Sequence, residues 1–123
     1  MTARMLLTVL GAGALVAGCG PTPPQAPLPS AKLLDRSTGG ISSACGESYQ
    51  IRAFGSPDPR EVQTLEASAL MHVDELATVY RRNPQWMYQG ETVTEIVRDA
   101  HSMLESCSLP QAAAGLRAAT GPR

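Results

Sequence analysis

Charge of one sign and aromatic side chains are both scarce in this sequence. Its 11 acidic residues nearly balance 10 basic ones, so the formal net charge is -1, and Lys32 is the only lysine. This balance excludes the basic surface that recruits nucleic acid, and it argues equally against electrostatic recruitment to anionic lipid. Aromatic residues make up 4% of the chain, and its 123 residues have room for one domain at most.

Catalytic patterns are missing as well. The sequence contains no HExxH motif, no glycine-rich phosphate loop and no recognisable Ser-His-Asp arrangement. Acidic residues such as Glu66, Asp74 and Glu75 are expected on solvated helix exteriors rather than paired in an apolar setting. We therefore expect a protein that is not an enzyme and needs no cofactor, with a small hydrolase as the catalytic alternative.

The N-terminus contains the three parts of a secretory signal. Arg4 supplies the positive charge, and residues 5–18 form an uncharged apolar run that is too short to span a bilayer comfortably. Two small residues, Ala17 and Gly18, then precede Cys19.

The run LVAGC, residues 15–19, resembles the lipobox of bacterial lipoproteins. The resemblance covers residues 1–19 only. It implies that a dedicated peptidase removes residues 1–18, that Cys19 carries a diacylglycerol, and that fatty acid such as palmitate can be added to the new amino group. Gly20 stands where an Asp would favour inner-membrane retention, so an outer-membrane location is permitted in a cell that has one. The alternative is an ordinary secretory signal, or a short uncleaved anchor, in which Cys19 has no role.

A proline-rich stretch follows Cys19 directly. GPTPPQAPLPS, residues 20–30, has five prolines, few backbone donors and no apolar periodicity, which predicts a semi-extended spacer. Such a spacer could hold a domain roughly 30 Å from a membrane. We therefore divide the chain into a signal peptide (1–18), a lipidated cysteine with its linker (19–30) and a helical domain (31–123).

Without Cys19, the chain retains Cys45 and Cys107. An even pair in an exported protein predicts one disulfide, with two free buried thiols as the alternative. The wide spacing excludes a CxxC redox motif, and two sulfurs are too few for structural zinc.

Apolar spacing and capping signals predict the helices. We expect a chain break at Gly39 and Gly40, followed by a short helix over residues 41–53. Asp58 at an N-cap, with Glu61 three residues later, predicts a long helix that Pro84 prevents from continuing. Its apolar stripe comprises Val62, Leu65, Ala69, Val73, Leu76 and Tyr80.

Thr92 and Glu95 form the capping box of a further helix, which Pro110 prevents from continuing. Cys107 falls on the apolar face of that helix, and residues 110–121 predict one more short helix. Together these elements predict a small all-α bundle of three or four helices, clamped by one disulfide.

The loop before the capping box contains Trp86, Met87 and Tyr88. Amphipathic Trp and Tyr are good interface anchors, so these residues are candidates for binding a partner. Alternatively, Trp86 folds back as a lid over the end of the bundle, which is the interpretation we favour.

The two histidines, His72 and His101, are almost equally distant in sequence from that loop, so an antiparallel helix pair would place them at roughly the same height. With nearby Met and Glu side chains they are candidate ligands for copper or zinc. The alternative is that both are solvated rings at the edges of apolar stripes.

These features predict a lipid-anchored, extracytoplasmic protein of the bacterial cell envelope that acts by contact with another envelope protein and does not bind nucleic acid. The alternative function is a metal-binding lipoprotein that uses His72 and His101.

The lipobox interpretation is tested by Cys19→Ser. We expect this change to abolish palmitate labelling and to stop removal of the signal, because the thiol is the acceptor of the lipid. Both are followed by fatty-acid labelling and gel mobility. A variant that is still processed normally and still membrane-bound would contradict the interpretation.

Overall fold

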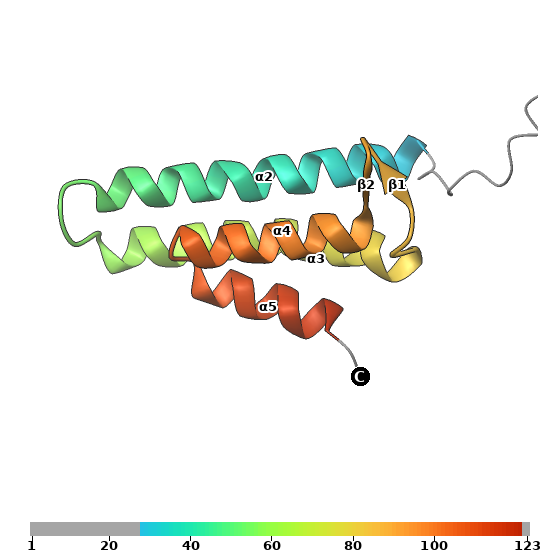
Figure 1. Ribbon diagram of the computed structural model, residues 1–123. Helices are drawn as coiled ribbons and strands as arrows, with labels where there is room; N and C mark the ends of the chain where they lie inside the picture. Colours follow the sequence, from blue (N-terminus) through green and yellow to red (C-terminus); the bar gives the residue numbers. More distant parts are fainter. Residues whose placement is uncertain (1–27, 122–123) are drawn as a thin grey trace, which may run out of the picture.

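The computed structural model describes residues 28–121, which form four helices and one short hairpin (Figure 1). The predicted all-α class is confirmed. The signal peptide, Cys19 and linker residues up to 27 lie outside the described residues. In chain order the elements are α2 (Leu28–Arg52), α3 (Pro59–Arg82), β1 (Met87–Tyr88), β2 (Glu91–Thr92), α4 (Val93–Ser106) and α5 (Pro110–Thr120).

Helix α2 differs most from its prediction. It is continuous through Gly39 and Gly40, so the expected break is wrong, and residues 28–30 of the expected linker are helical. Gly40 lies against the ring of His72 on α3, where a Cβ atom would overlap the ring. The glycine therefore permits close approach of α2 and α3, and this packing outweighs a helix-propensity cost of about 1 kcal/mol per glycine.

Helices α3 and α4 begin where the capping signals predict, and α5 begins at Pro110 as expected. At the start of α3, Asp58 Oδ1 accepts the N–H of Arg60 at 2.9 Å, although Glu61 makes no return bond among the described residues. At the start of α4, Thr92 and Glu95 form the complete capping box. None of the described helices is both long and apolar enough to cross a membrane.

The hairpin between α3 and α4 was not predicted. Its two strands pair Met87 with Thr92 and Tyr88 with Glu91. The two residues between the strands, Gln89 and Gly90, have φ values of 50° and 87°. Two positive φ values match a type I′ turn, the two-residue connection that suits the twist of paired strands.

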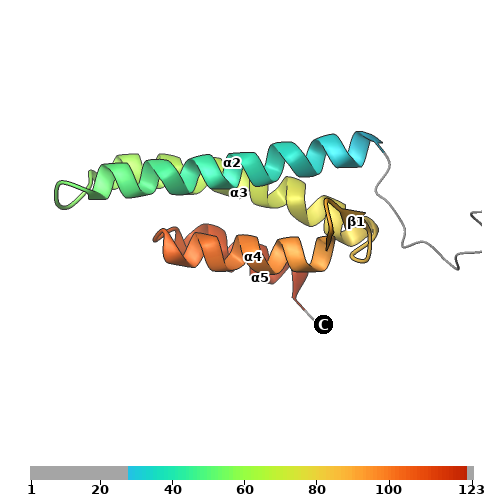
Figure 2. The same ribbon diagram turned by 45° about the horizontal axis from the view of Figure 1, so that its top comes forward.

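Helix α3 lies at the centre of the bundle. Helix α2 covers one side of it, and α4 and α5 cover the other (Figure 2). Every helix contributes to one continuous core, whose largest buried apolar side chains are Leu34, Ile41, Leu76, Leu104, Leu109 and Leu116.

A sharp corner joins α4 to α5. Ser108 has a φ of 63°, which is uncommon for a residue other than glycine. The N–H of Leu109 bonds to the Leu104 carbonyl at 3.0 Å, and the N–H of Ser108 bonds to the Glu105 carbonyl at 3.3 Å. This pattern is a Schellman motif, completed by contact of two fully buried leucines, Leu104 and Leu109.

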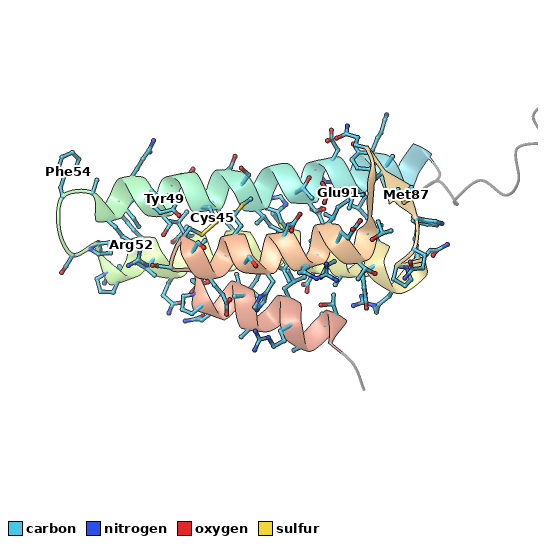
Figure 3. All side chains as sticks on the ribbon, viewed as in Figure 1. Cys45, Tyr49, Arg52, Phe54, Met87 and Glu91 are labelled. Carbon is cyan, nitrogen blue, oxygen red and sulfur yellow. A yellow bond between two sulfur atoms is a disulfide. The ribbon has the colours of Figure 1, made fainter. Side chains whose placement is uncertain are left out.

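Side chains of α2 clamp this corner. The Cys45–Cys107 disulfide joins α2 to the end of α4, with 5.3 Å between the two Cα atoms, so the predicted pairing is confirmed (Figure 3). Three further α2 side chains donate to backbone carbonyls at the end of α4 and in the corner that follows it. These bonds are Ser48 Oγ to Cys107 at 2.6 Å, Tyr49 Oη to Ser106 at 3.3 Å and Arg52 Nη2 to Ser108 at 3.0 Å.

Helix α5 receives its cap from α3. Leu109 at its N-cap offers no side-chain acceptor. Instead the carboxylate of Glu66 accepts the N–H groups of Gln111 at 3.0 Å and Ala112 at 2.9 Å. Glu66 is only 2% exposed, so its expected place on a solvated exterior is wrong. The reason is that α5 covers the side of α3 that the sequence pattern assigns to solvent.

The Glu66 cap is tested by Glu66→Gln. A neutral amide accepts these N–H groups less strongly and presents a donor to one of them, so we expect the free energy of unfolding to fall by about 2 kcal/mol. Urea denaturation measures this loss, and hydrogen exchange should show that α5 loses protection first. The matched control is Glu61→Gln on an exposed side chain of the same helix, which should change stability by less than about 0.5 kcal/mol. Equal effects of the two changes would contradict the capping role.

Candidate functional site

A groove of about 230 Å³ opens to solvent between α2, the hairpin and α4. Ile41 and Ala100 form its buried floor, and Ile96 and Met103 extend its apolar surface. Met103 is 41% exposed, although it is a large apolar side chain.

Contacts at both ends hold the groove in shape. At one end, the Cys45–Cys107 disulfide joins α2 to the end of α4. At the other end, the hydroxyl of Tyr88 donates to Asp35 Oδ1 at 3.2 Å and ties the hairpin to α2. Desolvation of this hydroxyl and its bond to Asp35 raise the pKa of Tyr88 above 10.0. The elements that form the groove are therefore joined to one another at two places.

The rim of the groove is acidic. Glu91 on β2 and Asp99 on α4 both line it, and none of its lining residues is basic. Hydrogen bonding to Asp99 is the main cause that raises the pKa of Glu91 above 4.5, followed by desolvation and by the charges of Asp99 and Glu95. Neighbouring carboxylates repel each other when both are ionised, so the rim attracts cations.

The three candidate loop residues lie at the hairpin. Trp86 and Tyr88 are half-buried and pack against the core, and Met87 is half-buried in β1. The Trp86 carbonyl accepts the N–H of Val93 at 2.9 Å, which holds the loop over the start of α4. Of the three, Tyr88 lines the groove. A role for them in binding a partner stays a prediction.

His72 belongs to the contact between α2 and α3. Its Nδ1 lies 3.0 Å from Glu75 Oε1, and Arg36 of α2 reaches Glu75 Oε2 at 2.8 Å. Burial raises the pKa of Glu75, but hydrogen bonds from His72 and Arg36, with their charges, outweigh burial and hold that pKa below 4.5. Glu75 is half-buried here rather than on a solvated exterior.

His101 lies instead beside α5. Its Nδ1 is 3.6 Å from Glu105 Oε1, and Arg117 of α5 is 3.8 Å from the other oxygen of Glu105. Its buried Nε2 atom has no hydrogen-bond partner among the described residues. The structure therefore places the two histidines in different interfaces, with mostly buried rings. Across residues 28–121, no group of three or more His, Cys, Asp or Glu side chains is arranged to hold a metal ion.

Two features of the molecule are absent from the predictions made from the sequence. Glu91, Glu95 and Asp99 follow one another at four-residue spacing; Glu95 and Asp99 share one face of α4, and Glu91 lies on β2 just before that helix. That spacing was the available signal for an acidic site. The second feature is Phe54, which is 99% exposed in the α2–α3 loop, at the opposite end of the bundle from the start of α2 (Figure 3).

The chain matches no protein-family model, no curated protein and no solved structure. Arguments about its function therefore rest on its own residues.

The acidic rim predicts a pH-dependent effect of Glu91→Gln. Because the folded state raises the pKa of Glu91, ionisation of this group opposes folding, and its contribution worsens as pH rises above 4.5. We expect the variant to have a higher melting temperature than the unmodified protein at pH 7, with the difference vanishing near pH 3.5, where the carboxyl is protonated in both states.

The matched control is Glu95→Gln, in the first turn of α4. Its bonds with Thr92 lower the pKa of Glu95, so its carboxylate stabilises the fold above pH 4.5 and loses this effect as pH falls. This control should have a lower melting temperature at pH 7. A lower melting temperature for Glu91→Gln at pH 7 would refute the repulsion at the rim.

Proposed function

We propose that this chain is a lipid-anchored, non-enzymatic lipoprotein of the bacterial cell envelope that binds a partner protein outside the cytoplasm. The lipobox-like run ending at Cys19 supports the anchor. The proline-rich sequence that follows Cys19 directly supports a spacer between the anchor and the helical domain.

The groove is the observation that carries the binding role. It is concave, solvent-exposed and held at both ends, and it combines apolar Ile96 and Met103 with acidic Glu91 and Asp99. Apolar surface beside a few placed charges is typical of recognition sites. Retaining two repelling carboxylates on a small domain lowers its stability, which favours a role in binding.

The alternative of a copper- or zinc-binding lipoprotein depends on His72 and His101 acting together. The placement of His72 against α2 and of His101 beside α5 favours the partner-binding proposal instead. Titrating the purified chain with Cu(I), Cu(II) and Zn(II) separates the two functions, since sites tighter than micromolar would support the metal alternative.

Photo-crosslinking in intact cells tests the proposed function. A photoreactive amino acid at Gln89, on the exposed edge of the groove, should form an adduct with an envelope protein. The same group at Gln63, exposed on α3, is the matched control and should not. Placing it at Phe54 tests whether the far tip also makes contact.

The adduct should depend on the anchor. In the Cys19→Ser variant we expect the Gln89 adduct to be lost or greatly reduced, because the domain no longer stays near the membrane. Absence of any adduct at Gln89 and at Phe54 would overturn the proposed function.

A further inference from the structure

We propose that the groove binds one long cationic side chain, Lys or Arg, carried by an apolar segment of the partner protein. This inference names the chemistry of the partner and rests on the function proposed above. Charge, apolar surface and size each contribute to it.

The rim of the groove carries acidic side chains and no basic ones. Glu91 and Asp99 line the groove, and no Lys, Arg or His does. Arg36 of α2 is paired with Glu75 at 2.8 Å, and Arg98 of α4 acts on Glu95. A cation between the two rim carboxylates would replace their repulsion with attraction to both. The same rim repels acidic segments and anionic headgroups, so it selects against them as well as for a cation.

The apolar surface suits the stem of such a side chain. Lys and Arg bury their methylene groups against apolar surface while the charged end stays at a polar rim. Ile41, Ile96 and Met103 offer this surface below the carboxylates. Tyr88 adds an aromatic wall, on which a guanidinium or ammonium group can also be stabilised.

The size of the groove limits the occupant to one or two side chains. Along α2 the groove lies between Asp35, which bonds to Tyr88, and Cys45 in the disulfide. Ten residues of helix span about 15 Å, which is too short to seat a whole partner helix. A volume of about 230 Å³ suits a single large side chain with part of a neighbour.

A second copy of this chain is the competing occupant. Arg117 on α5 has an exposed side chain between Leu116 and Ala118, so it has the required chemistry. However, Arg117 already lies 3.8 Å from Glu105 of its own chain. We therefore assign the groove to a different protein, and the experiment distinguishes the two.

Peptide binding to the purified lipidated chain in detergent micelles tests the inference. The probes are Ac-Ala-Leu-Arg-Leu-Ala-amide and the same peptide with Gln or Glu in place of Arg. We expect the Arg peptide to shift the NMR signals of Tyr88, Ala100 and Met103, the Gln peptide to do so weakly, and the Glu peptide not at all. Equal shifts with all three peptides would overturn the inference.

Matched variants connect this binding to the rim. The double change Glu91→Gln with Asp99→Asn should weaken binding of the Arg peptide about tenfold, as expected for two exposed charge pairs. The control, Glu47→Gln with Glu61→Gln, removes two exposed carboxylates at the other end of the bundle and should leave affinity unchanged. Because removing the rim repulsion should not destabilise the fold, melting curves of all variants exclude unfolding as the cause of lost binding. Equal loss in both double variants would refute the role of the rim.

Sequencing the adduct formed at Gln89 in cells separates failure of this inference from failure of the proposed function. A crosslinked segment with Lys or Arg between apolar residues, lost in the rim variant, supports the inference. A partner segment without a basic residue overturns it while leaving the proposed function intact. A segment of this chain around Arg117, with a dimer in analytical ultracentrifugation, overturns the choice of a different protein.

Discussion

The corner between α4 and α5 is the constraint on which the rest of the structure depends. Two helix ends meet there within a few residues, and their unpaired backbone groups would be costly to bury. Helix α2 supplies donors to the carbonyls of α4, and Glu66 of α3 accepts the first N–H groups of α5. One turn thereby holds all four helices in register, and the Cys45–Cys107 disulfide makes part of this arrangement covalent.

The contacts that join α2 to the end of α4 at this corner explain why a groove can persist between the two helices. Helices α2 and α4 are joined at the disulfide, and the hairpin joins them again through Tyr88 and Asp35. Between these two points their side chains leave an apolar concavity with an acidic rim. Side-chain arrangements that lower the stability of the fold, such as the neighbouring carboxylates of Glu91 and Asp99, are expected at ligand- or partner-binding sites.

Features that depend on interactions within a few residues could be predicted from the sequence, and features that depend on contacts between helices could not. Asp58, Thr92 and Glu95 were interpreted correctly because a cap acts within three residues. The pairing of Cys45 with Cys107 needed only the number of cysteines left after Cys19. Gly40 was misjudged because the close approach of His72, which makes a glycine favourable in α2, depends on another helix. Glu66 was misjudged for the same reason, since its partners are the backbone amides of α5.

By itself, therefore, the sequence determined the helical class, the starts of α3 and α4 and the disulfide pair, because short-range capping, apolar periodicity and cysteine number encode them. Only the tertiary structure decided the length of α2, the burial of Glu66, the separation of His72 from His101 and the existence of the groove. Each of these features depends on which side of one helix faces another helix. Such contacts join residues that are far apart in the sequence, so no pattern within a few neighbouring residues reveals them. The candidate site belongs to this second group, since its floor and rim combine residues of α2, the hairpin and α4.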